Sequence, residues 1–137
     1  MLSATTTIRV RYQETDKMGI AYHANYFTWF EVARVYLLDQ VGCPYKDLEE
    51  EGFFLPVLSC SCEYKSPARF DDLLTVNVSI PEIEQVRIKA HYSILKNDAI
   101  IATAKTTHAF VNKLGKVIRP PLNFLSKARN YQRAFGL

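Results

Sequence analysis

Residues 11–34, RYQETDKMGIAYHANYFTWFEVAR, join an acidic residue, a glycine turn and a bulky apolar segment in one continuous stretch. Apolar and polar residues alternate over residues 8–13, which predicts a strand with one buried face that ends near Asp16. Residues 25–41 are apolar on nearly every side, which predicts a buried helix. A carboxylate would then face the amides of a helix N-terminus, so that a base and an electrophile can flank one carbonyl. This arrangement suits acyl transfer.

The remaining chain predicts a sheet. Four further runs of alternating apolar and polar residues indicate strands over residues 58–64, 74–80, 86–94 and 100–110. The pair Asn97-Asp98 is typical of a tight hairpin, and residues 81–84 can turn the middle pair, so we expect antiparallel neighbours. Gly42 and Pro44 predict the end of the long helix, residues 45–51 a short helical turn, and residues 123–135 a weakly amphipathic terminal helix.

These elements define the fold class. One strand, one long helix and four more strands predict a single α+β domain over residues 1–137. Because one sheet cannot cover a helix that is apolar almost all round, we expect an antiparallel sheet that curves around the helix. A second copy of the chain would cover the rest, as a homodimer or homotetramer.

Composition excludes several classes of function. With 48% hydrophobic and 23% charged residues and a net charge of +3, the chain is typical of a globular protein, and its scattered basic residues do not indicate a nucleic-acid partner. We find no secretory signal and no membrane-length apolar run, and expect a cytoplasmic protein. Cys43, Cys60 and Cys62 lack metal-ligand spacing, and the last two are expected to be buried, inert thiols. The sequence indicates no metal site.

Two stretches resemble the 4-hydroxybenzoyl-CoA thioesterase family, whose members have the hotdog fold. Residues 15–23, TDKMGIAYH, match its strand-to-helix signature, and residues 65–73, KSPARFDDL, match a turn that leads into the third strand. Residues 22–34 are most similar to the bacterial branch associated with the Tol-Pal system. Asp71 stands where many hotdog thioesterases carry glycine. The resemblance implies a five-stranded antiparallel sheet and an acyl-CoA hydrolase that needs no metal or redox cofactor.

The resemblance assigns catalytic roles to two residues. Asp16 would activate water as a general base or attack the thioester carbonyl as a nucleophile, although an aspartate here can also simply cap the turn at residues 17–19. The backbone N–H of His23 would polarise the carbonyl from the helix N-terminus, and its side chain would either orient water or serve only the helix start.

Other positions are candidates for substrate binding. Tyr22, Asn25 and Tyr26 would shape the pocket mouth or cap the helix. Glu31 matches a helix carboxylate that some hotdog branches use as the base, but Arg34 three residues later favours a local ion pair instead.

Basic side chains would meet the phosphates of coenzyme A. The candidates are Arg69, Arg87, Lys89, Lys113, Lys116 and Arg119. His91 and His108 are expected to be edge or core residues of the strands. Three alternatives stay open: a thioesterase that acts on acyl carrier protein, a non-catalytic acyl-CoA-binding module, and a hotdog dehydratase, which the pattern fits poorly.

Overall fold

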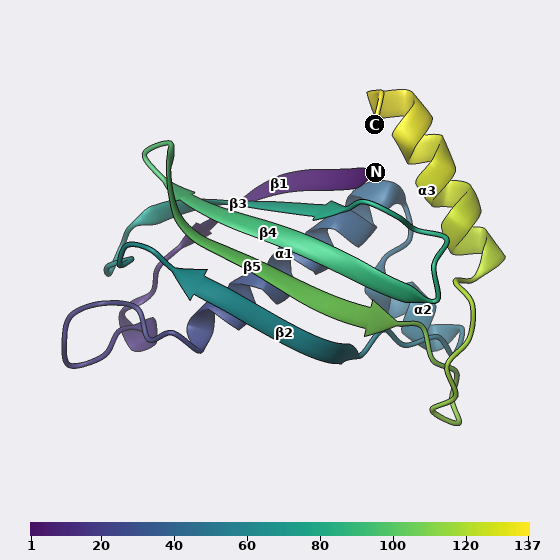
Figure 1. Cartoon of the computed structure of the whole chain (residues 1–137), viewed down its shortest axis with the longest axis horizontal. Helices are drawn as coiled ribbons and strands as arrows, with labels where there is room; N and C mark the ends of the chain where they lie inside the picture. Colours follow the sequence, from purple (N-terminus) through teal and green to yellow (C-terminus); the bar gives the residue numbers. More distant parts are fainter.

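Five antiparallel strands form one sheet that curves over a single long helix, in a computed structural model that describes all residues from 1 to 137. Figure 1 shows helix α1 (Asn25–Val41) behind the sheet, with both chain termini at the same end of the molecule. The strands lie in the spatial order β1-β3-β4-β5-β2. Their bounds are β1 Leu2–Arg9, β2 Val57–Tyr64, β3 Leu73–Ile80, β4 Arg87–Lys96 and β5 Ala99–Ala109, and the shorter helices are α2 Tyr45–Glu50 and α3 Leu122–Phe135. The predicted hotdog fold of the α+β class is confirmed.

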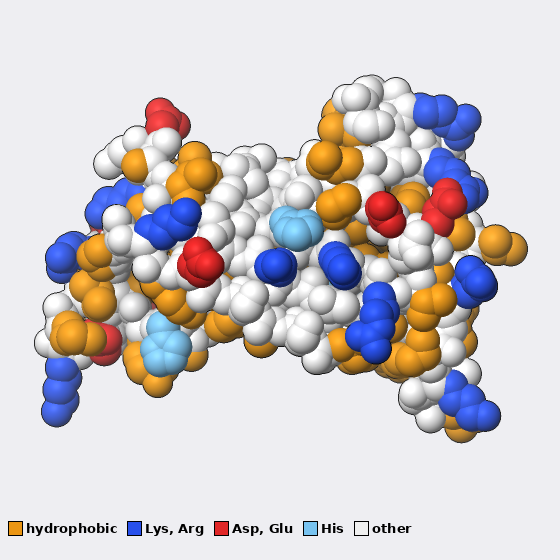
Figure 2. All heavy atoms as spheres, viewed as in Figure 1, with side chains coloured by type: hydrophobic (Ala, Val, Ile, Leu, Met, Phe, Trp, Pro, Cys, Tyr) orange, Lys and Arg blue, Asp and Glu red, His pale blue; other side chains and the backbone are white.

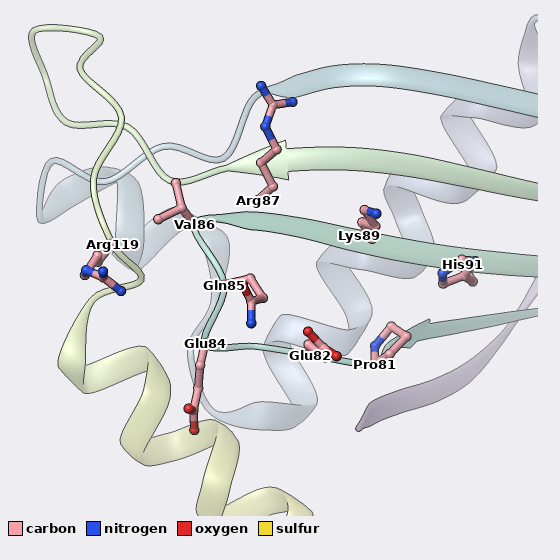
Figure 3. Close-up of a pocket in the computed structure, with 9 residues that line it drawn as sticks. All are labelled: Pro81, Glu82, Glu84, Gln85, Val86, Arg87, Lys89, His91 and Arg119. Carbon is pink, nitrogen blue, oxygen red and sulfur yellow. The ribbon is translucent and has the colours of Figure 1, made fainter.

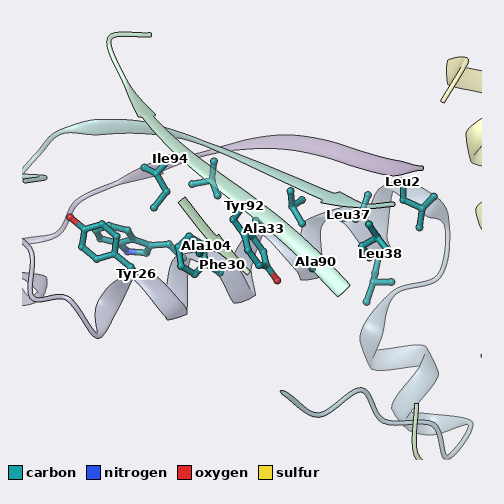
Figure 4. Close-up of a cluster of buried hydrophobic side chains, with 14 of the residues drawn as sticks. Leu2, Tyr26, Phe30, Ala33, Leu37, Leu38, Ala90, Tyr92, Ile94 and Ala104 are labelled. Atoms are coloured by element: carbon teal, nitrogen blue, oxygen red, sulfur yellow. The ribbon is translucent and has the colours of Figure 1, made fainter. Parts of the chain in front are cut away.

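Helix α1 has the predicted bounds because its local signals agree. Gly42 ends the helix with φ of +87°, a left-handed conformation that glycine adopts without strain. Trp29, Phe30 and Leu37 on its inner face are almost completely buried. Figure 4 shows how Phe30, Leu37 and neighbouring helix residues pack under the strands. Most of the stability of the helix therefore comes from burial against the sheet.

The sheet follows the predicted alternation. Leu74, Val76 and Val78 of β3 face the helix and are buried, as are the matching positions of β4 and β5. Asn97 and Asp98 both have positive φ (50° and 66°), the conformation required by a tight two-residue hairpin. The predicted β4–β5 hairpin is confirmed.

The prediction for the first strand is wrong at its end. Strand β1 stops at Arg9, and Tyr12–Glu14 form a 3-10 turn in which Tyr12 is 77% exposed. The physical cause is Glu14, whose carboxylate accepts the Arg11 amide at 2.8 Å and folds the chain back on itself. Asp16 therefore follows a turn rather than a strand.

The prediction that Cys60 is a buried thiol is also wrong. Strand β2 is an edge strand that pairs only with β5, while α1 packs mainly on β1 and β3. Cys60 is consequently exposed and Cys62 half-buried, whereas Cys43, after α1, is buried. None of the helices is long and apolar enough to cross a membrane.

Candidate active site

Asp16 lies in a tight turn between the 3-10 helix and α1. Its Oδ1 accepts the Met18 amide at 2.8 Å, and its own amide donates to the carbonyl of Ile20 at 2.9 Å. Gly19 allows this turn with φ of +77°. The carboxylate thus caps the turn with one oxygen, while Oδ2 accepts no hydrogen bond within the chain. Capping the turn and reacting with a ligand are compatible roles for Asp16.

The start of α1 offers unpaired amides. The N–H groups of His23 and Ala24 donate to no acceptor in the chain, and no side chain caps the helix. Such amides, together with the helix dipole, favour negative charge at this point. The carbonyl of His23 is held by the hydroxyl of Tyr64, which donates to it at 3.0 Å.

Asp16 and His23 line the same pocket, which has a volume of about 330 Å³. It is the cleft between the Asp16 turn, the start of α1 and the end of β2. Its other lining residues are Met18, Ile20, Ala21, Tyr26, Tyr64, Lys65, Ser66 and Pro67. Asp16 and the helix-start residue His23 therefore border one cleft with a partly apolar lining, as a reacting carbonyl would require.

The three neighbouring candidates occupy different places. Tyr26 is buried in the pocket wall, and burial raises the pKa of its hydroxyl. Tyr22 is half exposed and packs against the His23 ring, with 4.4 Å between ring centroids and a tilt of 45° between the rings. Asn25 does not cap the helix, since its Nδ2 donates to the carbonyl of Glu14 at 2.7 Å. Only Tyr26 of these three lines the pocket.

Sequence reasoning missed two residues of this region, Glu14 and Tyr64. Burial alone would raise the pKa of Glu14, but hydrogen bonds from the Arg11 amide, the Trp29 indole and the Arg11 guanidinium outweigh it and lower the pKa below its ordinary value. The sequence contains no signal for the burial of Glu14, since its neighbours Gln13, Thr15 and Asp16 are all polar. Tyr64 was placed on a strand face, but nothing in the sequence indicated that this face reaches the helix start.

The predicted ion pair between Glu31 and Arg34 does not form. Arg34 instead donates to the hydroxyl of Tyr92 at 3.1 Å, because the sheet packed over α1 offers a fixed acceptor. Both residues line a separate crevice of about 270 Å³ between α1 and the start of β2. Glu31 is therefore not in the Asp16 pocket of the same chain.

Tyr92 also belongs to a buried chain of hydrogen bonds that runs from Arg34 to the carbonyl of Leu55. Its hydroxyl bonds to Thr106 at 2.7 Å, Thr106 bonds to Nε2 of His108 at 2.7 Å, and Nδ1 of His108 reaches the carbonyl of Leu55 at 3.3 Å. Burial, followed by the charge of Arg34, lowers the pKa of His108 to about 4. His108 is a buried core residue, as predicted, whereas the prediction is wrong for His91, which lies exposed on the central strand β4 and is neither an edge nor a core residue.

Three of the basic candidates lie at the end of the sheet opposite the Asp16 pocket. Arg87 and Lys89 of β4, with His91 and Arg119, line a hollow of about 750 Å³ on the outer face of the sheet. Figure 3 shows these side chains, with Glu82 and Glu84 also at the hollow, and Figure 2 shows Lys, Arg and His side chains gathered on this face.

The other cations lie elsewhere. Arg69 is exposed next to the Asp16 turn, where its backbone bridges to Ile20. Lys113 and Lys116 are exposed in the turn after β5. No group of three His, Cys, Asp or Glu residues is placed to hold a metal ion.

Known proteins agree with this fold. A sequence profile described as the Thioesterase-like superfamily matches residues 10–128. A "Putative esterase" from Aquifex aeolicus is 37% identical over 117 residues, 85% of this chain and 91% of that protein. The "Acyl-CoA thioesterase YbgC" of Haemophilus influenzae is 32% identical over 111 residues, 80% of this chain and 81% of the relative.

A solved structure, a DHNA-CoA thioesterase from Staphylococcus aureus, superposes with a TM-score of 0.89 at 30% identity and covers 99% of this chain and 94% of its own. The chain belongs to the Thioesterase-like superfamily. The predicted relationship to hotdog thioesterases and the predicted class, an enzyme that hydrolyses thioesters, are confirmed. The Tol-Pal branch stays a prediction.

Proposed function

We propose that this enzyme hydrolyses an acyl-CoA thioester to a free carboxylic acid and coenzyme A, with Asp16 and the start of α1 as its catalytic centre. The observation that carries the proposal is that Asp16 and His23 line one pocket of about 330 Å³, with unpaired amides at the helix start. The names of the relatives, an acyl-CoA thioesterase and a DHNA-CoA thioesterase, support the substrate class.

In the proposed reaction the thioester carbonyl lies between the two groups. The amides of His23 and Ala24 donate hydrogen bonds to the carbonyl oxygen, on which negative charge develops, and Asp16 acts from the other side. As a base, the free Oδ2 takes a proton from water, the oxygen of which bonds to the carbonyl carbon; as a nucleophile, it bonds to that carbon and water later cleaves the anhydride. Either route breaks the C–S bond and expels a thiolate, which takes up the proton held by Asp16 in the first route, or a proton from water in the second, and leaves as the thiol. The proposal includes no metal or redox cofactor.

Arg87 and Lys89 would bind the phosphates of coenzyme A. They would do so for the Asp16 pocket of a neighbouring copy, not for that of their own chain. In the sheet, Tyr64 pairs with Ala102, next to Ile94 of β4, whereas Arg87 pairs with Ala109 at the opposite end. Seven residues of strand separate these positions along β4, roughly 23 Å. A single copy thus places the Asp16 pocket and the basic hollow at opposite ends of the sheet.

A second copy removes this separation. The outer edge of β2 is unpaired, and Val57 and Leu58 of β2 and Val32 and Val35 of α1 are exposed beside it. A two-fold antiparallel pairing of β2 with its copy would bury these side chains and continue the sheet. It would also place the beginning of β2 in one copy beside the end of β2 in the other. The basic hollow and the Glu31–Arg34 crevice of one copy would then adjoin the Asp16 pocket of its partner.

This dimer provides room for the whole substrate. The acyl group would enter the mostly apolar crevice beside α1, and the phosphates would meet Arg87 and Lys89 of the same neighbouring copy. Sedimentation equilibrium should give twice 15.7 kDa or a higher even multiple. A monomer at assay concentration would contradict the shared site.

The proposed function is tested by thiol release from short, long and aromatic CoA esters. We expect turnover of at least one ester, and esters of an acyl carrier protein run in parallel separate the two carriers. Turnover of the carrier-protein esters alone would replace coenzyme A in the proposal. No thiol release from any ester, together with tight acyl-CoA binding, would indicate a binding module instead.

A further inference from the structure

Glu14 accepts hydrogen bonds from residues on both sides of the Asp16 turn. Its Oε1 accepts the Arg11 amide at 2.8 Å, and its Oε2 accepts the Trp29 indole N–H at 2.8 Å and Nη2 of Arg11 at 3.4 Å. Its backbone carbonyl accepts the Tyr22 amide at 2.8 Å and Nδ2 of Asn25 at 2.7 Å. One residue therefore joins the 3-10 turn, the segment before α1 and the second turn of α1.

These contacts determine the path of the chain on either side of Asp16. Two residues after Glu14, the backbone of Asp16 pairs with Ile20, and Thr15 bridges to Ala21. The Asp16 turn is thus a short loop, and the hydrogen bonds of Glu14 connect its two ends to α1. The turn is also held from the segment before β3, where the Ala21 amide donates to the carbonyl of Ala68 at 2.8 Å and Ile20 bridges to Arg69.

Glu14 does not itself reach a substrate. Its side chain is 4% exposed and does not line the Asp16 pocket. Both carboxylate oxygens already accept hydrogen bonds from the chain, and burial keeps a substrate away from them. The charged group that contacts it is Arg11, whose own side chain is mostly exposed.

We propose that Glu14 is a positioning residue, which sets where the Asp16 carboxylate stands relative to the unpaired amides at the start of α1. This inference rests on the proposed function. A displacement of about 1 Å in a reacting group can reduce turnover by up to ~10²-fold. A buried carboxylate with several donors is a more rigid link than an exposed ion pair, because solvent does not compete for its oxygens.

The test is Glu14→Gln, with Glu49→Gln as a control on the exposed surface of α2. Glutamine offers one acceptor oxygen where the carboxylate offers two, so the Arg11 amide and the Trp29 indole cannot both be satisfied. We expect kcat to fall by ~10-fold or more while KM stays within about twofold, since the binding surfaces are unchanged. The control should match the wild type in both constants.

Trp29→Phe probes the same link from the helix side. It removes one donor and leaves Glu14 bonded to Arg11, so kcat should fall by a smaller factor. The double variant should be no worse than Glu14→Gln alone, because both changes remove the same contact. Trp29→Phe also decides the matter where Glu14→Gln fails to fold.

Trp29 is the only tryptophan of the chain, so its fluorescence reports on Glu14 without any substrate. As pH falls below the ordinary glutamate range, protonation of Glu14 should change the emission, and this step should persist in Asp16→Asn but vanish in Glu14→Gln. An emission step that Glu14→Gln retains would contradict the contact.

The kinetic outcomes separate the two proposals. A wild type that releases no thiol refutes the proposed function and with it the positioning role. An active wild type with unchanged kcat in Glu14→Gln and in Trp29→Phe, even with a lower unfolding temperature, refutes the positioning role alone. A raised KM at constant kcat would make Glu14 a binding residue and would likewise overturn the inference.

Discussion

The Asp16 pocket and the basic hollow on the outer sheet face are built in opposite ways. Around Asp16, the backbone of the turn is hydrogen-bonded to neighbouring segments, and the residue that anchors it, Glu14, is buried, so that the unpaired Oδ2 and helix-start amides stand on a fixed frame. Around Arg87 and Lys89, neither cation has a carboxylate partner within the chain, and both are exposed. Reacting groups need fixed geometry, whereas phosphate recognition at a surface needs available charge.

The largest expected effect is on Asp16. Asp16→Asn keeps the cap on the turn but removes the charged oxygen, so kcat should fall by ~10²-fold or more with the fold intact. Steady-state thiol release measures it, and circular dichroism checks the fold. Near-normal turnover would show that another residue carries out the chemistry, and the proposed difference between the two regions would then be wrong.

The basic hollow should behave differently. Arg87→Ala combined with Lys89→Ala should raise KM for a CoA ester by about tenfold with little change in kcat, since two surface charge contacts contribute about 1 kcal/mol or less each. The difference from wild type should shrink between low and high salt, because exposed charges are screened. A kcat defect that is independent of salt would show that these cations act on the chemistry.

Mixed dimers sharpen the comparison. Mixing Asp16→Asn copies with copies that lack Arg87 and Lys89 should restore thiol release at low substrate, since each mixed dimer then carries one intact shared site. Random mixing predicts about a quarter of the wild-type sites. Activity equal to the average of the two parents would place both regions in the same copy.

The smallest expected effect is on the His23 side chain. His23→Ala keeps the backbone amide, so kcat should fall by less than about tenfold, well below the loss in Asp16→Asn. Parallel kinetics of the two variants give the ranking. A greater loss in His23→Ala would assign the imidazole, rather than the amide, the main role.

Local signals and tertiary contacts explain which expectations succeeded. The bounds of α1 could be predicted because a long, mostly apolar segment, Gly42 and Pro44 all agree. The end of β1 could not be predicted. The Arg11 amide donates to the Glu14 carboxylate, and this one hydrogen bond turns the chain although the alternating strand pattern continues. Arg34 donates to Tyr92, which lies 58 residues away in the sequence, so local spacing cannot indicate this partner.

The predictions for the site divide in the same way between local signals and tertiary contacts. The meeting of Asp16 with His23 follows from one contiguous motif, and the structure brings both to one pocket. The positions of Arg87 and Cys60 depend on which strands are central and which lie at the edge, and alternation alone carries no such information.

The central claim is that the Asp16 carboxylate and the amides at the start of α1 flank one thioester carbonyl. The most direct measurement is a crystal structure of the Asp16→Asn variant with an unhydrolysed acyl-CoA that the wild type turns over. The account predicts the carbonyl oxygen at about 3 Å from the amides of His23 or Ala24, with the side chain at position 16 on the opposite side of the carbonyl. A thioester bound outside this pocket, with those amides still unpaired, would contradict it.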